Sequence, residues 1–170
     1  MGRVSSSPTR PSGAWEGVLA GGAAAGILDI LFAFVFYGLR GIGPVRILQS
    51  VASGLLGKKA FEGGAASAAL GAVLQLFIPT VAAAVYLGFD RAISAVRDHP
   101  VVCGLLYGIA VYGFMNLVVL PLSAIPFKPR FPIGVLVPSL LAHMFLVGLP
   151  IALAVRRFSG RAGLSGRESR

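Results

Sequence analysis

Four polar side chains that can form hydrogen bonds lie inside long apolar runs of the sequence: Asp29, Gln75, Asn116 and His143. Two of them, Asp29 and His143, can also gain or lose a proton. A carboxylate at the centre of a bilayer costs about 2.5–3.5 kcal/mol, so it persists only where it is paired, protonated or hydrated. Imidazole both donates and accepts hydrogen bonds near neutral pH, which makes His143 a natural partner for Asp29, while Gln75 can satisfy the remaining lone pairs. We therefore predict a buried polar cluster of these four residues as the candidate functional site.

Two functions of this cluster stay open. Asp29 and His143 could form a relay that translocates protons or a small solute at the midplane of the bilayer. Alternatively, the same groups only hold the helices together, at about 0.6–2 kcal/mol for each interhelical hydrogen bond, in a non-catalytic four-helix module of unknown specific role. We favour the module and keep translocation as the alternative.

Enzymatic and metal chemistry fit the sequence less well. Ser139 and His143 are four residues apart and can share a helical face, so an intramembrane hydrolase with Asp29 orienting the histidine is a third, weaker alternative. A metal site needs three or four ligands, whereas the apolar runs hold one histidine, one aspartate and one cysteine, Cys103. We assign no catalytic residues and expect no metal or cofactor. Whether the protein is an enzyme stays open, with a non-enzyme favoured.

Four apolar runs must position these side chains: residues 17–39, 65–89, 101–122 and 133–155. Each is long enough to cross a hydrocarbon core of about 30 Å as a helix that rises about 1.5 Å per residue. The chain has 15 Lys and Arg and 6 Asp and Glu, and all of them except Asp29 lie outside these runs. The sequence therefore predicts an all-α integral membrane protein, a bundle of four transmembrane helices.

Small residues are expected to bring these helices close together. Asp29, Gln75 and His143 lie near the centres of their runs, which places them at one membrane level. Residues spaced by three or four share one face of a helix, and small ones let two backbones approach closely. We therefore predict helix-packing contacts at the glycines that follow this spacing: Gly22, Gly26, Gly71, Gly104 and Gly108. The same spacing leaves a homo-oligomer open.

A shorter helix is expected between the first two spans, over residues 44–57. Its apolar residues fall on one side, whereas Arg46, Gln49 and Ser50 fall on the other. A helix of this length cannot cross a bilayer, so it is interfacial or re-entrant. Residues 90–100 predict a short helical turn between the second and third spans. The prolines at 121, 126, 129 and 132 predict a non-helical third loop.

The remaining segments are polar and basic. Residues 1–14 and 158–170 are predicted as disordered tails around a single transmembrane domain over 15–157. The net charge of +9 comes from basic residues at the ends of the apolar runs, a placement that suits anionic lipid headgroups and not nucleic acid. The side that holds both termini carries more basic residues than the other, so we predict that both termini are cytoplasmic.

Three stretches carry a resemblance to known proteins. The first is ILQSVASG at 47–54, and it is followed by Gly57, Ala60, Phe61, Gly63 and Gly64. The other two are VLPLS at 119–123 and GLPIA at 148–152. Over about residues 17–155 the chain resembles a family of small bacterial multi-span inner-membrane proteins without an assigned function. This resemblance implies a multi-pass protein of the bacterial inner membrane, and it supplies no active-site residues.

Overall fold

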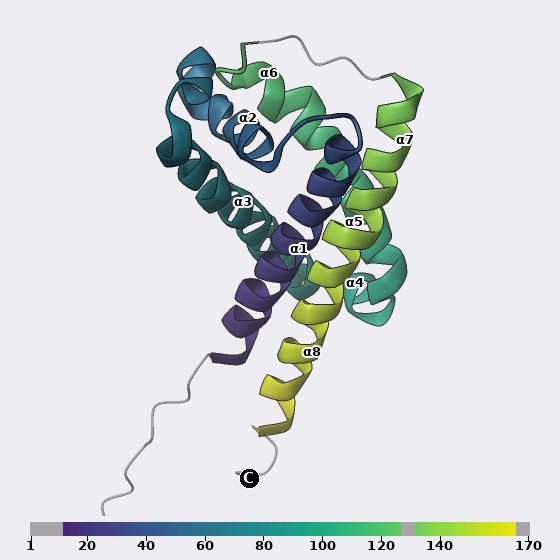
Figure 1. Ribbon diagram of the computed structural model, residues 1–170. Coiled ribbons are helices and arrows are strands. Elements are labelled where there is room, and N and C mark those ends of the chain that lie inside the picture. Colours follow the sequence, from purple (N-terminus) through teal and green to yellow (C-terminus); the bar gives the residue numbers. More distant parts are fainter. Residues whose placement is uncertain (1–11, 127–131, 166–170) are drawn as a thin grey trace, which may run out of the picture.

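The computed structural model describes residues 12–126 and 132–165, and this part of the chain is helical without a strand (Figure 1). The elements, in chain order, are α1 (Ser12–Gly38), α2 (Pro44–Leu56), the 3₁₀ turn η1 (Gly57–Phe61), α3 (Gly64–Ala92), α4 (Ser94–Asp98), α5 (Pro100–Phe114), the π-helical segment η2 (Met115–Val119), α6 (Leu120–Leu122), α7 (Ile133–Ala142), the π-helical segment η3 (His143–Gly148) and α8 (Leu149–Ser165).

Four helical stretches in the described part are long and apolar enough to cross a membrane: Gly13–Gly38, Gly64–Ala92, Pro100–Leu122 and Ile133–Ser159. The third and fourth of these each run through a π-helical segment without a break. The predicted four-helix membrane fold is confirmed, and α2 is the predicted short helix after the first span. The predicted helical turn between the second and third spans is α4.

Helices extend beyond several predicted boundaries. α1 begins at Ser12, inside the segment predicted as the N-terminal tail, and α8 continues to Ser165, inside the predicted C-terminal tail. The rest of both tails lies outside the described residues. Propagating an existing helix forms one hydrogen bond for each residue that is fixed, so a span can continue past the end of its apolar run. Pro121 is part of α6, and the chain leaves the helix at Ser123.

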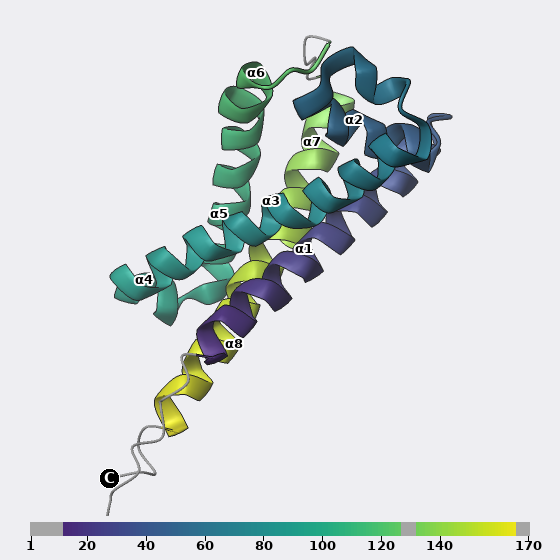
Figure 2. The same cartoon turned by 90° about the vertical axis from the view of Figure 1, so that its left-hand side faces the viewer.

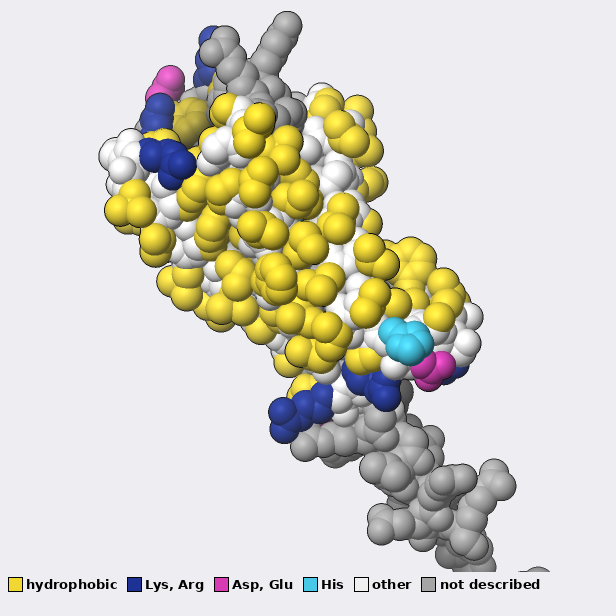
Figure 3. Space-filling view, turned by 90° about the vertical axis from the view of Figure 1, so that its right-hand side faces the viewer, with side chains coloured by type: hydrophobic (Ala, Val, Ile, Leu, Met, Phe, Trp, Pro, Cys, Tyr) yellow, Lys and Arg dark blue, Asp and Glu magenta, His cyan; other side chains and the backbone are white. Residues whose placement is uncertain are grey.

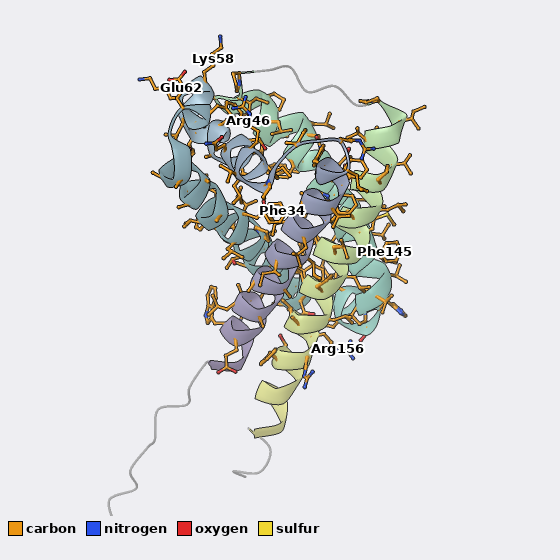
Figure 4. The ribbon with its side chains drawn as sticks, viewed as in Figure 1. Phe34, Arg46, Lys58, Glu62, Phe145 and Arg156 are labelled. Carbon is orange, nitrogen blue, oxygen red and sulfur yellow. The ribbon has the colours of Figure 1, made fainter. Side chains whose placement is uncertain are left out.

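The face of the bundle that Figure 3 shows is apolar over most of its height. Leu31, Phe77 and Leu117 are 51%, 60% and 76% exposed. Soluble monomers rarely expose contiguous apolar patches larger than about a few hundred Å², so this surface is suited to lipid. Charged side chains lie at the two ends of the bundle, with Lys58 at the α2 end and Arg156 at the opposite end (Figure 4).

The core lies around α1, which packs on both α3 and α8. Val18 and Ala25 of α1 are buried against Ala83 of α3 and Ile151 of α8. The five glycines predicted for packing each face a neighbouring element, on which an added Cβ would press: Gly22 faces Thr80, Gly26 faces Gln75, Gly71 faces Leu48, Gly104 faces Gly148 and Gly108 faces His143. Gly71 therefore seats the short helix α2, whereas the other four bring spanning helices together.

α3 and α5 form a V whose closed end lies beside α4 (Figure 2). At this end the Tyr107 hydroxyl donates to the carbonyl of Ala82 (2.7 Å), and the Tyr107 ring meets the ring of Tyr86 edge to face. At the open end the amide of Ala124 donates to the carbonyl of Gly54 (2.9 Å), which joins the segment after α6 to α2. The two spans therefore touch near one membrane surface and separate towards the other.

α2 is fixed against α3 by its polar face. The buried side chain of Gln49 donates to the carbonyl of Gly64 (3.1 Å) and lies 3.4 Å from the Ser67 hydroxyl. Pro44 opens the helix in its first turn, and Gly57 ends it with φ +59°, a conformation that favours glycine. α2 buries residues from both of its sides, namely Gln49 and Ser53 from the polar side and Ile47 and Ala52 from the apolar side. Arg46 of the polar side stays exposed. The helix lies across the open end of the V (Figure 2).

Candidate functional site

Three of the four predicted polar residues line one cavity of about 280 Å³ inside the bundle. Asp29 comes from α1, Gln75 from α3 and His143 from the first residue of η3. The cavity also receives Ser50 of α2 and Ser123, which follows α6. We call this space the central cavity. Most of its other lining residues are apolar, so a few polar groups face a largely hydrocarbon-like space.

The carboxylate of Asp29 is bound by Gln75. The Gln75 amide nitrogen donates to Asp29 Oδ2 at 2.8 Å, and it also lies 3.4 Å from the carbonyl oxygen of Gly26. This bond is possible because α1 and α3 approach closely at Gly26, where a Cβ would lie 2.7 Å from the Gln75 carbonyl oxygen. One oxygen of the carboxylate is therefore satisfied by an interhelical hydrogen bond, and no described residue donates to the other.

His143 lines the same cavity but is bonded within its own helix. Its Nδ1 lies 2.9 Å from the carbonyl oxygen of Ser139, and the ring packs edge to face on Tyr112 at 5.1 Å between centroids. A carbonyl only accepts, so Nδ1 carries the hydrogen and Nε2 of the neutral ring is an acceptor. The hydrogen-bond partner of Asp29 is thus Gln75, and not His143, which the sequence favours as its partner.

The Ser139–His143 arrangement lacks the contact that a hydrolase requires. It is the Ser139 carbonyl, and not its hydroxyl, that meets the imidazole, and Ser139 is not among the residues that line the central cavity. In the described residues no three His, Cys, Asp or Glu side chains gather as a metal site would require. Cys103 lies apart, with its Sγ 3.7 Å from the carbonyl oxygen of Ala95.

Asn116 is not brought into the central cavity. Its Nδ2 donates to the carbonyl of Tyr112, one turn earlier in the same helix, at 2.8 Å. It lies in η2, the segment whose neighbouring residues Met115 and Val119 do line the cavity. The structure therefore joins three of the four predicted polar groups and leaves the fourth on its own helix.

Both π-helical segments border the central cavity. η2 ends two residues before Pro121, and η3 ends two residues before Pro150. Proline has no N–H, and its ring clashes with the carbonyl four residues earlier, so the α-helical hydrogen-bond ladder cannot continue through it and the preceding turn widens. Single π turns in helices occur frequently at functional sites. The Leu-Pro pairs at 120–121 and 149–150 are the signal in the sequence that marks these turns.

Ser50 and Ser123 are the cavity residues that the sequence alone does not assign to the site. Each hydroxyl donates to a carbonyl three residues earlier at 2.7 Å, Ser50 to Ile47 and Ser123 to Leu120. Ser50 falls on the predicted polar face of the 44–57 helix, which was the available signal. Nothing in the sequence pattern marks Ser123, because only the folded chain brings the end of the third span against α2.

A wider cavity, of about 660 Å³, lies next to the central cavity along α2 and shares Ser50 with it. We call it the vestibule. Arg46 and Lys58 are its charged residues, and both lie at the α2 end of the bundle (Figure 4). The Arg46 guanidinium lies over the Phe61 ring, 4.0 Å from the ring centroid. Ser50 therefore stands between a basic outer space and the central cavity.

No protein-family model matches this chain, and no match to it was found among curated proteins or solved structures.

Proposed function

We propose that this protein is a non-catalytic membrane carrier that holds a small solute, or a proton, at Asp29 in the central cavity and passes it across the bilayer. The observation that carries the proposal is the position of this acid. Asp29 faces a cavity built by several spans, and one of its two carboxylate oxygens receives no hydrogen bond from the described residues. Intramembrane acids of this kind mark substrate pathways and proton relays.

The energetic cost of Asp29 supports a role beyond packing. An asparagine could hold the same glutamine without burying a charge, whereas a carboxylate at mid-depth costs about 2.5–3.5 kcal/mol. Interhelical hydrogen bonds contribute about 0.6–1.7 kcal/mol, which is less than this cost. A carboxylate that destabilises the span and faces a cavity is better explained by the binding of an ion or ligand than by helix association alone.

A second candidate is the purely structural module, and one observation favours it. The 2.8 Å bond between Gln75 and Asp29 ties α1 to α3 without involving any ligand. In this function the acid and the amide only fix the crossing of two helices. The experiment below separates the two functions, because only the carrier requires the negative charge of Asp29.

We place the carrier in a bacterial inner membrane with both termini in the cytoplasm. This location follows from the resemblance of residues 47–64, 119–123 and 148–152 and from the larger number of basic residues on the side of the termini. The arginines at that end, Arg91, Arg97 and Arg156, line a further cavity of about 430 Å³ with Asp90. Their placement supports contact with anionic headgroups.

The test is transport by the Asp29→Asn variant in liposomes that contain a pH-sensitive dye. Proton flux is measured as acidification of the interior under an imposed potential, and solute flux as uptake of a panel of radiolabelled small amines, alcohols and carboxylic acids by the same liposomes. We expect the variant to lose about tenfold or more of the flux, because the charge that holds the solute is removed. Asp98→Asn, the same change at an exposed acid of α4, is the matched control and should keep the native flux.

Melting of both variants in detergent completes the experiment. A folded Asp29→Asn protein without flux supports the carrier. Native flux in Asp29→Asn, or no flux in the native protein with any solute of the panel, contradicts it. Native flux together with a raised melting temperature favours the structural module, since the variant then only removes a costly buried charge.

A further inference from the structure

The hydrogen-bond donors of the central cavity are already occupied. Gln75 points its amide nitrogen at Asp29 and the Gly26 carbonyl, and His143 donates through Nδ1 to the Ser139 carbonyl. The hydroxyls of the two cavity serines both donate to carbonyls of their own helices. A ligand in this cavity therefore finds few free donors on the protein.

The groups that remain are acceptors, and one carries a negative charge. They are the second carboxylate oxygen of Asp29, the amide oxygen of Gln75 and the lone pairs of the serine hydroxyls. A complementary ligand brings N–H or O–H donors, and a positive charge beside the carboxylate forms the stronger, charge-assisted bond. The chemistry of the cavity thus favours an ammonium group over a neutral alcohol, and both over a carboxylate.

An apolar groove joins this cavity from the side. The groove has a volume of about 420 Å³ and lies between α3 and α5, in the V that Figure 2 shows. Its lining residues are apolar except Tyr107, whose hydroxyl is bonded to Ala82. Five residues line both the groove and the central cavity: Ile78, Ala82, Val111, Met115 and Val119. A hydrocarbon chain in the groove can therefore reach the polar groups without leaving apolar surroundings.

The vestibule is the less favourable route for a cation. Its charged residues, Arg46 and Lys58, are both positive. Like charges at close range repel, so these side chains raise the free energy of an ammonium ion on that side. The groove between α3 and α5 carries no charged residue in its lining and opens on the apolar surface of the spans.

We propose that the ligand is a lipophilic ammonium ion, a primary or secondary amine on an apolar body, which enters from the bilayer through the groove between α3 and α5. Its ammonium group binds Asp29 and donates to the neighbouring acceptors, while its apolar body lies in the groove. This inference rests on the proposed function, because it names the solute that the carrier takes up. The pairing offsets the cost of the buried carboxylate.

The experiment compares three probes with the same chain and different head groups: dodecylamine, dodecanol and dodecanoic acid, each with a photoactivatable diazirine at the chain end. Each probe is irradiated with the protein in liposomes, and mass spectrometry locates the adducts. We expect the amine to label residues 77–85 and 110–119 about tenfold more than the alcohol does, because only the amine carries a charge opposite to that of Asp29. In the Asp29→Asn variant, labelling by the amine probe should fall to the level of labelling by the alcohol probe.

Two matched variants test the route. Ala110 is exposed and lines the groove but not the central cavity, so Ala110→Phe should block labelling without touching the polar site. Ala24 is exposed on α1 and lines none of the cavities described above, so Ala24→Phe makes the same change elsewhere on the lipid-facing surface and should leave labelling unchanged. Equal loss in both variants overturns the lateral route.

The outcomes separate this inference from the proposed function. Equal labelling by the three head groups means that ordinary lipid chains fill the groove and overturns the ammonium ligand, as does strongest labelling by dodecanoic acid. Absence of labelling by every probe, together with a dimer in cross-linking, means that a second copy covers the groove and also overturns it. Selective labelling without transport supports the ligand and contradicts the carrier. If transport requires Asp29 but labelling does not depend on the head group, the carrier function is supported and the ammonium ligand is contradicted.

Discussion

Asp29 and Gln75 show how one contact decides the chemistry of a half-buried acid within an apolar span. The sequence offers this carboxylate a histidine and one amide, Gln75, at comparable depth, and the fold selects the amide of Gln75 at 2.8 Å. Because an amide donates without carrying charge, the negative charge of Asp29 stays uncompensated by the described residues. A neutral donor on one oxygen and an open second oxygen are what a cation or proton site requires.

The Gln75–Asp29 bond should be measurable as a coupling. Gln75→Leu removes the donor from a half-buried carboxylate, so we expect the free energy of unfolding to fall by about 1–3 kcal/mol. The double variant Asp29→Leu with Gln75→Leu removes both polar partners and should be more stable than Gln75→Leu alone. Unfolding by sodium dodecyl sulfate in mixed micelles measures both. Equal stability of Gln75→Leu and the native protein would show that the bond contributes nothing.

At the scale of the elements, glycines and prolines together shape the site. Glycines on α5 let the fourth span come close enough for Gly108 to touch the backbone of His143, the first residue of η3. Pro121 and Pro150 widen the turns before them, and both widened turns border the central cavity. The glycine contacts hold α5 close to the fourth span, whereas the π-helical turns η2 and η3 widen their helices beside the central cavity. Together they leave room for a cavity inside a narrow bundle.

Two glycines of α5 provide a test of this packing. In Gly108→Ala the new Cβ meets the backbone of His143 and Met144, so the third and fourth spans must separate, at a cost of about 1–3 kcal/mol of stability. Gly113→Ala has open space at the corresponding position and should be neutral or stabilising, since alanine is a better helix former by about 0.8–1.0 kcal/mol. Detergent melting curves compare the two. A stable Gly108→Ala protein would mean that the helices do not pack as closely as described.

At the scale of the whole molecule, the bundle has an apolar belt between two ends that both carry basic residues. The α2 end carries the basic vestibule, and the opposite end carries the three arginines near α4 and α8. The V of α3 and α5 is closed at the second end and opens towards the first (Figure 2). A bundle with one open end and one lateral groove is asymmetric across the membrane.

The orientation of this asymmetry can be tested with reporters in bacterial cells. We expect a fluorescent protein at the C-terminus to fold and fluoresce in the cytoplasm, because the side of the termini carries the larger number of basic residues. Alkaline phosphatase joined after Pro126, between the third and fourth spans, should be active on the outer side. The reverse pair of signals would place the α2 end and its vestibule in the cytoplasm.

The sequence by itself determined the membrane architecture. Runs of about 20 apolar residues can satisfy their backbone groups in lipid only as helices, so the four spans and the depth of Asp29, Gln75 and His143 follow from composition and length. The short amphipathic helix over 44–57 follows in the same way from its length and from the spacing of its apolar residues. These features depend on hydrogen bonds within one segment, which local sequence controls.

Only the tertiary structure decided which polar groups meet. The choice of Gln75 over His143 for Asp29, the retention of Asn116 on its own helix and the position of Ser123 against α2 depend on how far each helix is rotated and where it crosses its neighbours. Those angles are set by contacts between segments that are distant in the sequence, such as Gly26 against Gln75 and Gly108 against His143. The groove between α3 and α5 has the same origin, since a space between two helices is a property of neither one alone.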